Sequence, residues 1–110
     1  MKLAIVGSRS LTVDNMEKYL PKGVAEIISG GAKGIDSCAK AYALEKGIKY
    51  TEFLPDYSRF GRSAPIKRNI QIIEAADAVI AFWDGKSRGT YFVIEKCKEL
   101  RKPYRVYGKK

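Results

Sequence analysis

The stretch SGGAKGID, residues 29–36, joins an apolar run directly to a helical segment. The apolar run covers residues 24–29, and residues 34–46 carry apolar side chains at helical spacing before Gly47 ends the segment. Glycines allow the sharp turn that such a junction needs. This strand–turn–helix unit predicts an α/β fold.

The same alternation continues along the rest of the chain. It predicts strands at residues 3–7, 48–54, 78–83 and 104–107, helices at residues 13–20, 64–76 and 89–102, and a polar, aromatic and basic loop at residues 55–63. We therefore expect one three-layer, Rossmann-like α/β domain over residues 1–110, with a five-stranded parallel sheet. The residues expected to face inward on the helices are Ile35, Cys38, Ala39, Tyr42 and Ala43; Ile66, Ile70 and Ile73; and Val93, Cys97 and Leu100.

The charges on the strands predict their order. Residues 3–7 and 78–83 are almost wholly apolar, as central strands covered on both faces must be. The third strand carries Lys49 and Glu52 and the fifth carries Arg105, which is typical of edge strands. This favours the order 3-2-1-4-5 over the flavodoxin-like order 2-1-3-4-5, which would bury the third strand.

Composition narrows the function classes. The 110 residues include 21 Lys and Arg against 12 Asp and Glu, and the net charge of +9 favours an anionic partner. Histidine is absent, which excludes Ser–His–Asp and Cys–His catalysis and histidine metal ligands. Cys38 and Cys97 lack metal-ligand spacing, so we expect no metal site. Without a signal peptide or a span of transmembrane length, the sequence predicts a cytoplasmic protein with no membrane contact.

Three glycine-bearing turns follow the first, second and fourth strands and must meet on the carboxyl rim of the sheet, where the strand order reverses. Backbone N–H groups, helix N-termini and nearby cations make such a rim suitable for phosphate. Neither GxxxxGK[ST] nor GxGxxG is present, so a P-loop and a dinucleotide fingerprint are both unsupported. The candidate phosphate-binding residues are Gly7, Ser8, Arg9, Ser29, Gly30, Gly31, Lys33, Gly34, Asp36, Arg68, Asn69, Asp84, Ser87, Arg88, Gly89 and Thr90.

Two features of the candidate set leave alternatives open. Asp36 is either a favourable charge at the start of a helix or a ligand contact. The loop at residues 55–63 mixes aromatic and basic side chains, which suits base stacking on a nucleic acid but also a loop anchored by its own aromatics. Its candidate nucleic-acid contacts are Tyr57, Arg59, Phe60 and Arg62. Trp83 is expected to pack within the protein.

The order of the motifs resembles the SLOG superfamily of Rossmann-like nucleotide-binding domains, and in particular its small stand-alone members related to YspA and YpsA. The residues that carry the resemblance are 5–9 (IVGSR), 29–36 (SGGAKGID), 67–69 (KRN), 76–82 (ADAVIAF) and 87–90 (SRGT). The resemblance implies a 3-2-1-4-5 sheet and a nucleotide-derived ligand, and it makes a homodimer an expectation.

Two relatives within that superfamily suggest different functions. The DNA-processing protein A family binds single-stranded DNA, and it shares the turns at residues 7–9 and 31–36 and the pair Arg68-Asn69. The cytokinin-activating phosphoribohydrolases, also called lysine-decarboxylase-like, use an arginine that Arg68 matches and a glutamate three residues after the Gly-Thr pair. That position is Val93 here, and Glu95 would face elsewhere on a helix.

The sequence therefore predicts binding of a nucleotide or nucleotide-derived, phosphate-bearing ligand at the carboxyl rim, as a sensor or binding module. Single-stranded nucleic-acid binding is the first alternative. A nucleotide N-glycosidase or phosphoribohydrolase is the second, in which Asp36, Asp84 or Glu74 would replace the missing glutamate. No cofactor other than the nucleotide-derived ligand is expected.

Overall fold

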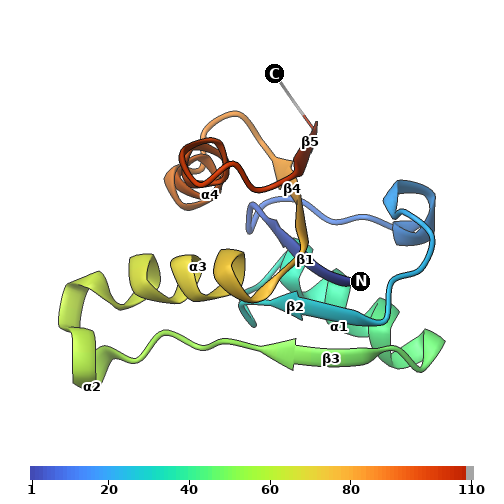
Figure 1. Cartoon of the computed structure of the whole chain (residues 1–110), viewed down its shortest axis with the longest axis horizontal. Coiled ribbons are helices and arrows are strands. Elements are labelled where there is room, and N and C mark those ends of the chain that lie inside the picture. Colours follow the sequence, from blue (N-terminus) through green and yellow to red (C-terminus); the bar gives the residue numbers. More distant parts are fainter. Residues whose placement is uncertain (109–110) are drawn as a thin grey trace.

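The computed structural model describes residues 1–108 and contains a five-stranded parallel sheet in the order β3-β2-β1-β4-β5 (Figure 1). The strands are β1 (Lys2–Gly7), β2 (Glu26–Ser29), β3 (Lys49–Glu52), β4 (Ala78–Trp83) and β5 (Tyr104–Gly108). The predicted fold class and strand order are confirmed. Residues 109 and 110 of the expected domain lie outside the described residues, and within residues 1–108 no helix is long and apolar enough to cross a membrane.

The centre of the sheet is apolar and its edges are charged. Ala4 of β1 lies between Ile28 of β2 and Val79 of β4, and all three are buried. At the β3 edge, the Thr51 hydroxyl donates to the Glu26 carboxylate at 2.7 Å, and Lys49 lies 3.6 Å from the same carboxylate. The edge charges are therefore accommodated by pairing at the surface, as their distribution in the sequence indicates.

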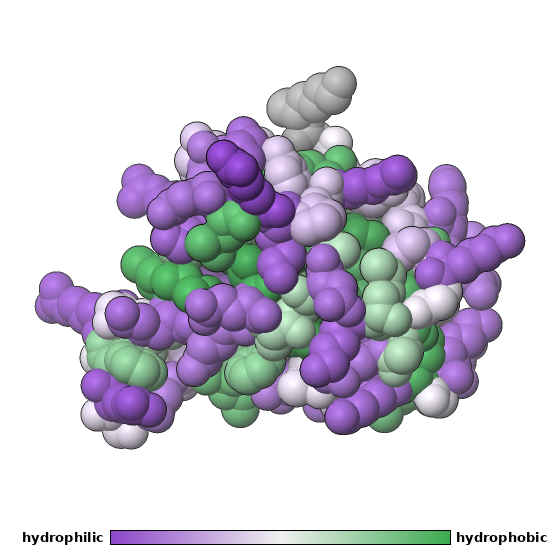
Figure 2. All heavy atoms as spheres, viewed as in Figure 1, coloured by the Kyte–Doolittle hydropathy of each residue, from purple (hydrophilic) through white to green (hydrophobic). Residues whose placement is uncertain are grey.

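Helices cover the two faces of the sheet and create two cores. Helix α1 (Ile35–Lys46) and the 3₁₀ helix η1 (Met16–Tyr19) pack on one face, over Leu3 and Ile5. Helices α3 (Ala64–Ala75) and α4 (Arg88–Glu99) pack on the other face, over Ala4 and Val6. Successive buried side chains of β1 thus enter the two cores in turn, and the sheet is the middle one of three layers. Figure 2 shows a largely hydrophilic surface on which apolar side chains gather where α3 and α4 lie next to each other.

Two predicted segments differ from the structure. Residues 13–20 form only the single 3₁₀ turn η1, because Asp14 and Asn15 favour cap positions and Pro21 prevents continuation of a helix. Residues 55–63 are not a loop throughout, since they contain α2 (Tyr57–Phe60) and the 3₁₀ helix η2 (Gly61–Ser63). The Asp56 side chain accepts a hydrogen bond from the backbone N–H of Arg59 at 3.2 Å and thereby caps α2.

The buried faces of α3 and α4 also differ from the prediction. Ile66 is 46% exposed because the first turn of α3 lies beyond the ends of the strands, next to α2 (Figure 1). Ile72 is buried instead. Leu100 is also 46% exposed, because α4 ends at Glu99 and Leu100 is its C-cap, while Ile94 is buried. The predicted inward face of α1 is confirmed, with Ile35, Ala39 and Ala43 fully buried in the core.

Candidate functional site

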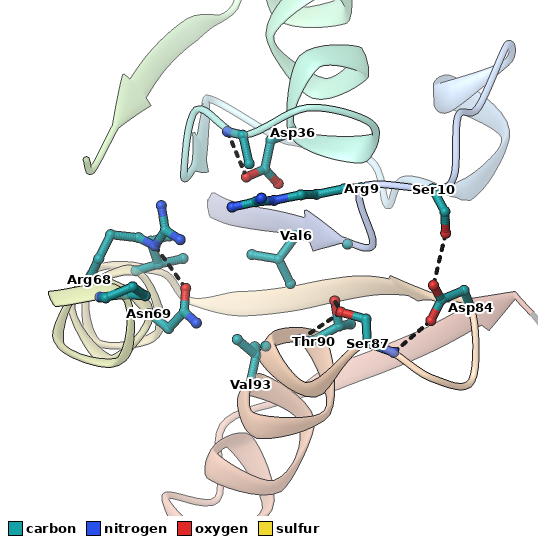
Figure 3. A pocket seen from close by; sticks show the side chains of 15 residues that line it. Val6, Arg9, Ser10, Asp36, Arg68, Asn69, Asp84, Ser87, Thr90 and Val93 are labelled. Atoms are coloured by element: carbon teal, nitrogen blue, oxygen red, sulfur yellow. Dashed lines mark hydrogen bonds between the residues drawn. The ribbon is translucent and has the colours of Figure 1, made fainter. Parts of the chain in front are cut away.

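A cavity of about 410 Å³ opens at the carboxyl end of the sheet, between β1 and β4, where the strand order reverses (Figure 3). Its size lies within the range of pockets that hold small ligands. Parallel α/β sheets place ligand sites at this switch point. The residues that line it are Val6, Gly7, Arg9, Ser10, Ala32, Asp36, Pro65, Arg68, Asn69, Ile72, Asp84, Ser87, Gly89, Thr90 and Val93.

The cavity combines an apolar wall with positive charge. Val6, Ile72 and Val93 are buried apolar residues that come from β1, α3 and α4. Figure 3 shows the Arg9 side chain extending from the loop after β1 across the cavity, between Asp36 and Arg68. The first turn of α4 contributes Gly89 and Thr90, where helix geometry adds partial positive charge.

Arg68 is held in place by two hydrogen bonds. Its Nη1 donates to the Gly30 carbonyl at 2.8 Å, and its Nε donates to Asn69 Oδ1 at 2.9 Å. Burial lowers the pKa of the Arg68 guanidinium, and the nearby Asp36 and Tyr57 oppose this shift. The arginine side chain nevertheless remains charged at neutral pH. The two hydrogen bonds therefore hold the Arg68 guanidinium group in one orientation at the cavity.

Within residues 1–108, neither arginine of the cavity forms an ion pair. The ion pairs among residues 1–108 are formed by Lys40, Lys49, Lys96 and Lys98. Neither Arg9 nor Arg68 takes part in them. Two guanidinium groups on one cavity wall are typical of sites that bind a phosphate or a carboxylate.

Asp36 lies in the first turn of α1 and is only 6% exposed. Its Oδ2 accepts a hydrogen bond from the Ala32 N–H at 3.2 Å, while its buried Oδ1 has no hydrogen-bond partner among the described residues. Burial raises the pKa of the Asp36 carboxyl, and the hydrogen bond from Ala32 and the charge of Arg68 only partly oppose this shift. Asp36 is thus a polar group whose bonding is incomplete in the protein alone.

In contrast to Asp36, Asp84 has a carboxylate with several hydrogen-bond donors within the protein. Its carboxylate accepts hydrogen bonds from the Ser10 hydroxyl and from the N–H groups of Lys86 and Ser87, all at 2.8 Å. The two backbone N–H groups, followed by Ser10, lower the pKa of Asp84 to about 2. The Asp84 N–H also donates to the Ser8 hydroxyl at 3.1 Å. Asp84 therefore ties the loop after β1 to the start of α4, and its hydrogen-bonding capacity is largely used by the protein.

The glycine turn after β2 contributes less of the cavity surface than its sequence indicates. Its lining residues are Ala32 and Asp36, whereas Gly30 is buried against Arg68, whose Nη1 would lie 2.7 Å from an added β-carbon. Ser29 is also buried and donates its hydroxyl hydrogen to the Ile5 carbonyl at 2.7 Å. The candidate residues that do not line the cavity are Ser8, Ser29, Gly30, Gly31, Lys33, Gly34 and Arg88.

The aromatic and basic residues of α2 and η2 also lie outside the cavity lining. The Arg59 guanidinium stacks 5.0 Å from the centre of the Phe60 ring, and Tyr57 is 60% exposed. Trp83 packs within the protein as expected, because its Nε1 donates to the Ser87 carbonyl at 2.9 Å and its ring lies against Tyr91. The basic–aromatic segment is thus a separate surface beside α3.

Sequence reasoning missed several lining residues, including Ser10, Ala32, Pro65 and Ile72. One signal was available for Val6, since the last side chain of a central strand before its glycine must lie next to the switch point. Val93 lines the cavity and is buried. Among residues 1–108 no group of three Cys, Asp or Glu side chains is placed to hold a metal ion.

The sheet order and the position of the cavity define a Rossmann-like α/β protein with two arginines in a cavity at its switch point. A family model described as DNA recombination-mediator protein A matches residues 1–81, and the chain belongs to this family. The match includes Arg9, Asp36 and Arg68 and ends before α4. Searches of curated proteins and of solved structures gave no significant match. The predicted relation to the DNA-processing proteins is confirmed, while the resemblance to YspA and to phosphoribohydrolases stays a prediction.

The raised pKa of Asp36 has a consequence for stability. The folded protein binds a proton at this carboxyl more readily than the unfolded chain, so this group lowers the free energy of unfolding as the pH rises from the ordinary value of 3.8 through the folded pKa. Asp36→Asn removes the titration. We expect the stability of the wild type relative to Asp36→Asn to fall between pH 4 and pH 7, measured by urea denaturation. A constant or rising difference would contradict this assignment.

Proposed function

We propose that this protein binds a nucleotide or nucleotide-derived ligand by its phosphate in the cavity at the carboxyl rim. The observation that carries the proposal is the presence of Arg9 and Arg68 on one wall of a cavity of about 410 Å³, with neither arginine in an ion pair among the described residues. The apolar surface of Val6, Ile72 and Val93 would receive a less polar part of the ligand. An apolar wall with a few fixed polar groups is the usual composition of a small-ligand site.

The start of α4 supports the placement of the phosphate. Ser87 caps this helix by accepting from the Thr90 N–H, which leaves the N–H groups of Arg88 and Gly89 in the first turn, where no intrahelical acceptor exists. An added β-carbon at Gly89 would meet no atom within 4 Å, so the backbone there is open to a ligand. A phosphate oxygen would accept these hydrogen bonds and gain from the helix dipole.

We place the function in binding rather than in cleavage of an N-glycosidic bond. That reaction needs a carboxylate to activate water and stabilise the developing positive charge on the sugar. Val93 occupies the position of the glutamate that would supply it. Asp84 is a poor substitute because its oxygens already accept from Ser10, Lys86 and Ser87.

Single-stranded nucleic acid is the second candidate ligand. The net charge of +9 and membership in the DNA recombination-mediator family favour it. The exposed Tyr57, Arg59 and Arg62 would add stacking and phosphate contacts beside the cavity.

Thermal shift with a panel of nucleotides and a short single-stranded oligonucleotide, at low and high salt, separates the two candidates. A ligand at 100 times its dissociation constant stabilises by about 2.7 kcal/mol, which raises Tm by roughly 10 °C or more in a domain of this size. A shift with one class of nucleotide that persists at high salt supports the proposal. A shift with the oligonucleotide alone, lost at high salt, supports the second candidate, and no shift with any nucleotide overturns the first.

Gly89→Ala is expected to weaken nucleotide binding without destabilising the protein. The methyl group has room in the free protein and alanine favours the helix, so Tm without ligand should stay the same or rise. The same methyl group would hold a phosphate away from the first-turn N–H groups, and the loss of hydrogen bonds to a charged ligand lowers affinity by about 10-fold to 100-fold. Titration calorimetry checks this, and unchanged affinity would place the phosphate elsewhere.

A further inference from the structure

A second cavity of about 380 Å³ lies on the face of the sheet that α1 and η1 cover, where β4 and β5 begin. Its lining comes from the first residues of β1 and β4, from β5 and from the end of η1. It shares no lining residue with the cavity at the carboxyl rim, and the proposed function does not use it. Its volume lies within the range of pockets that hold small ligands.

This cavity exists because helices cover only part of that face. Helix α1 packs over β1, β2 and β3, and Figure 1 shows it away from β5. The chain between β1 and β2 forms only the single 3₁₀ turn η1. Within residues 1–108, no longer helix packs over the beginning of β4 and β5 on this side. Part of the apolar sheet face beside η1 therefore stays open to a ligand.

The floor of the second cavity is apolar and aromatic. Leu3 and Ile80 are buried core residues that also line it. Tyr19 and Tyr107 are half-buried and line it as well, with their ring centres 4.9 Å apart. Phe82 lies against both rings and holds them in place. Such a lining suits the apolar part of a ligand, whether aromatic or aliphatic.

Two cationic side chains line the second cavity, and no carboxylate accompanies them there. Lys18 comes from η1 and Arg105 from β5. Neither forms an ion pair among residues 1–108, and the lining contains no Asp or Glu. Arg105 is paired with Ile80 in the register of β4 and β5, so its side chain leaves the sheet beside the apolar floor. The cavity is therefore complementary to a ligand that is both apolar and negatively charged.

The kind of anion follows from the backbone around the second cavity. Phosphates are commonly bound by helix N-termini or by groups of backbone N–H donors. Among the described residues no helix begins at this cavity, and Pro21 and Pro103 in its lining have no backbone N–H. Recognition then rests on the cationic side chains, and an arginine binds a carboxylate through two parallel hydrogen bonds. A singly charged carboxylate suits this site better than a phosphate.

We propose that the second cavity binds a small carboxylic acid with an apolar body. The carboxylate pairs with Arg105 and Lys18, and the apolar body packs on Leu3, Ile80 and the tyrosine rings. The site lies outside the nucleotide cavity and does not depend on nucleotide binding. It gives this protein a second class of ligand.

Two-dimensional amide NMR spectra of the full chain both locate and measure this binding. The probes are indole-3-acetate, which has an aromatic body, and octanoate, which has an aliphatic one. Indole-3-acetamide and octanamide keep each body without the charge, and acetate keeps the charge without the body. We expect at least one of the two acids to shift the backbone signals of η1 and β5. Its amide and acetate should each bind at least about 5-fold more weakly.

Arg105→Gln and Lys18→Gln should each lower the affinity for the acid that binds by about 5-fold to 10-fold. This range lies between the loss of an exposed ion pair and the loss of a hydrogen bond to a charged group. Lys67→Gln is the matched control, because it removes the same charge from an exposed residue of α3 outside both cavities. It should keep wild-type affinity. The same spectra show that each variant is folded.

Each outcome decides for or against the second site. Binding of the aromatic acid, the aliphatic acid or both supports the proposal and defines the apolar body. The proposal is overturned if neither acid shifts the signals of η1 or β5 at millimolar concentration, or if the amides bind as tightly as the acids. Equal losses in Lys67→Gln also overturn it, because binding would then follow overall charge. No nucleotide enters this test, so its result is separate from that of the proposed function.

Discussion

Arg9→Glu is expected to abolish nucleotide binding while the protein stays folded. Arg9 extends across the cavity, and its side chain is exposed and joins no ion pair within residues 1–108, so the fold does not depend on it. Loss of a charge-assisted hydrogen bond to phosphate costs about 1.5–3 kcal/mol, and the new carboxylate adds repulsion. Affinity should therefore fall by roughly 100-fold or more. The stability change should stay near ±0.5 kcal/mol, as for most surface substitutions.

Arg105→Glu is the matched control, because Arg105 is an exposed arginine of the edge strand β5 outside this cavity and the net charge changes equally. Titration calorimetry with the same nucleotide should give wild-type affinity for this variant. Equal losses in both variants would show that the ligand is attracted by overall charge and would contradict a defined phosphate site. Arg9→Gln, which removes the charge without reversing it, should give an intermediate loss.

Strand order was predictable because burial on both faces imposes a simple chemical requirement. Charges are disfavoured on a central parallel strand that helices cover on both faces, which favours the edges for Lys49 and Arg105. The structure places both on the edge strands β3 and β5. Glu26 at the start of the internal strand β2 is an exception, and Thr51 and Lys49 of β3 pair with it. Helix faces were less predictable, since the spacing of apolar residues does not tell where a helix passes the end of the sheet. Ile66 fits the helical period but belongs to the first turn of α3, which extends beyond the strands in Figure 1, and it is exposed.

The location of the cavity at the carboxyl end of the sheet could also be predicted from the sequence. The hydrogen-bonding roles of its residues could not. Both Asp36 and Asp84 follow strands and lie near cations in the sequence. Only the three-dimensional contacts show that Asp84 has three hydrogen-bond donors while Asp36 keeps a free oxygen. The Ser10 partner of Asp84 is 74 residues away, so no local pattern indicates it.

The role of a glycine in a turn is equally hard to predict from the sequence. A glycine in a turn after a strand is compatible with an approaching phosphate and equally with an approaching side chain. At Gly7 an added β-carbon would lie 2.5 Å from Ile35 Cγ1, so the first residue of α1 takes the space. At Gly89 that space is open. Both glycines stand next to a Ser-Arg pair in the sequence, and only packing separates a structural glycine from one that leaves room for a ligand.

Gly34→Ala is expected to destabilise the protein strongly and to disrupt the site as a consequence. Gly34 is the N-cap of α1 with φ of 74° and ψ of −123°, a conformation open almost only to glycine. An added β-carbon would also lie 2.6 Å from the Arg9 carbonyl oxygen and 2.7 Å from that of Ser8. Because these are backbone atoms, they cannot rotate aside, and the loop that carries Arg9 would have to move. The combined strain and overlap should lower the free energy of unfolding by about 3 kcal/mol or more.

Gly47→Ala separates the two contributions. Gly47 is the C-cap of the same helix with φ of 67°, and an added β-carbon there meets no atom within 4 Å. Only the left-handed backbone is then unfavourable, at about 1–2 kcal/mol. Urea denaturation should rank Gly34→Ala well below Gly47→Ala, and only the first should also lose nucleotide affinity under conditions where it is folded. Similar losses of unfolding free energy in both variants would mean that the loop after β1 can move at little cost. Gly34 would then be needed only for the backbone conformation of its turn, and it would not fix the position of Arg9.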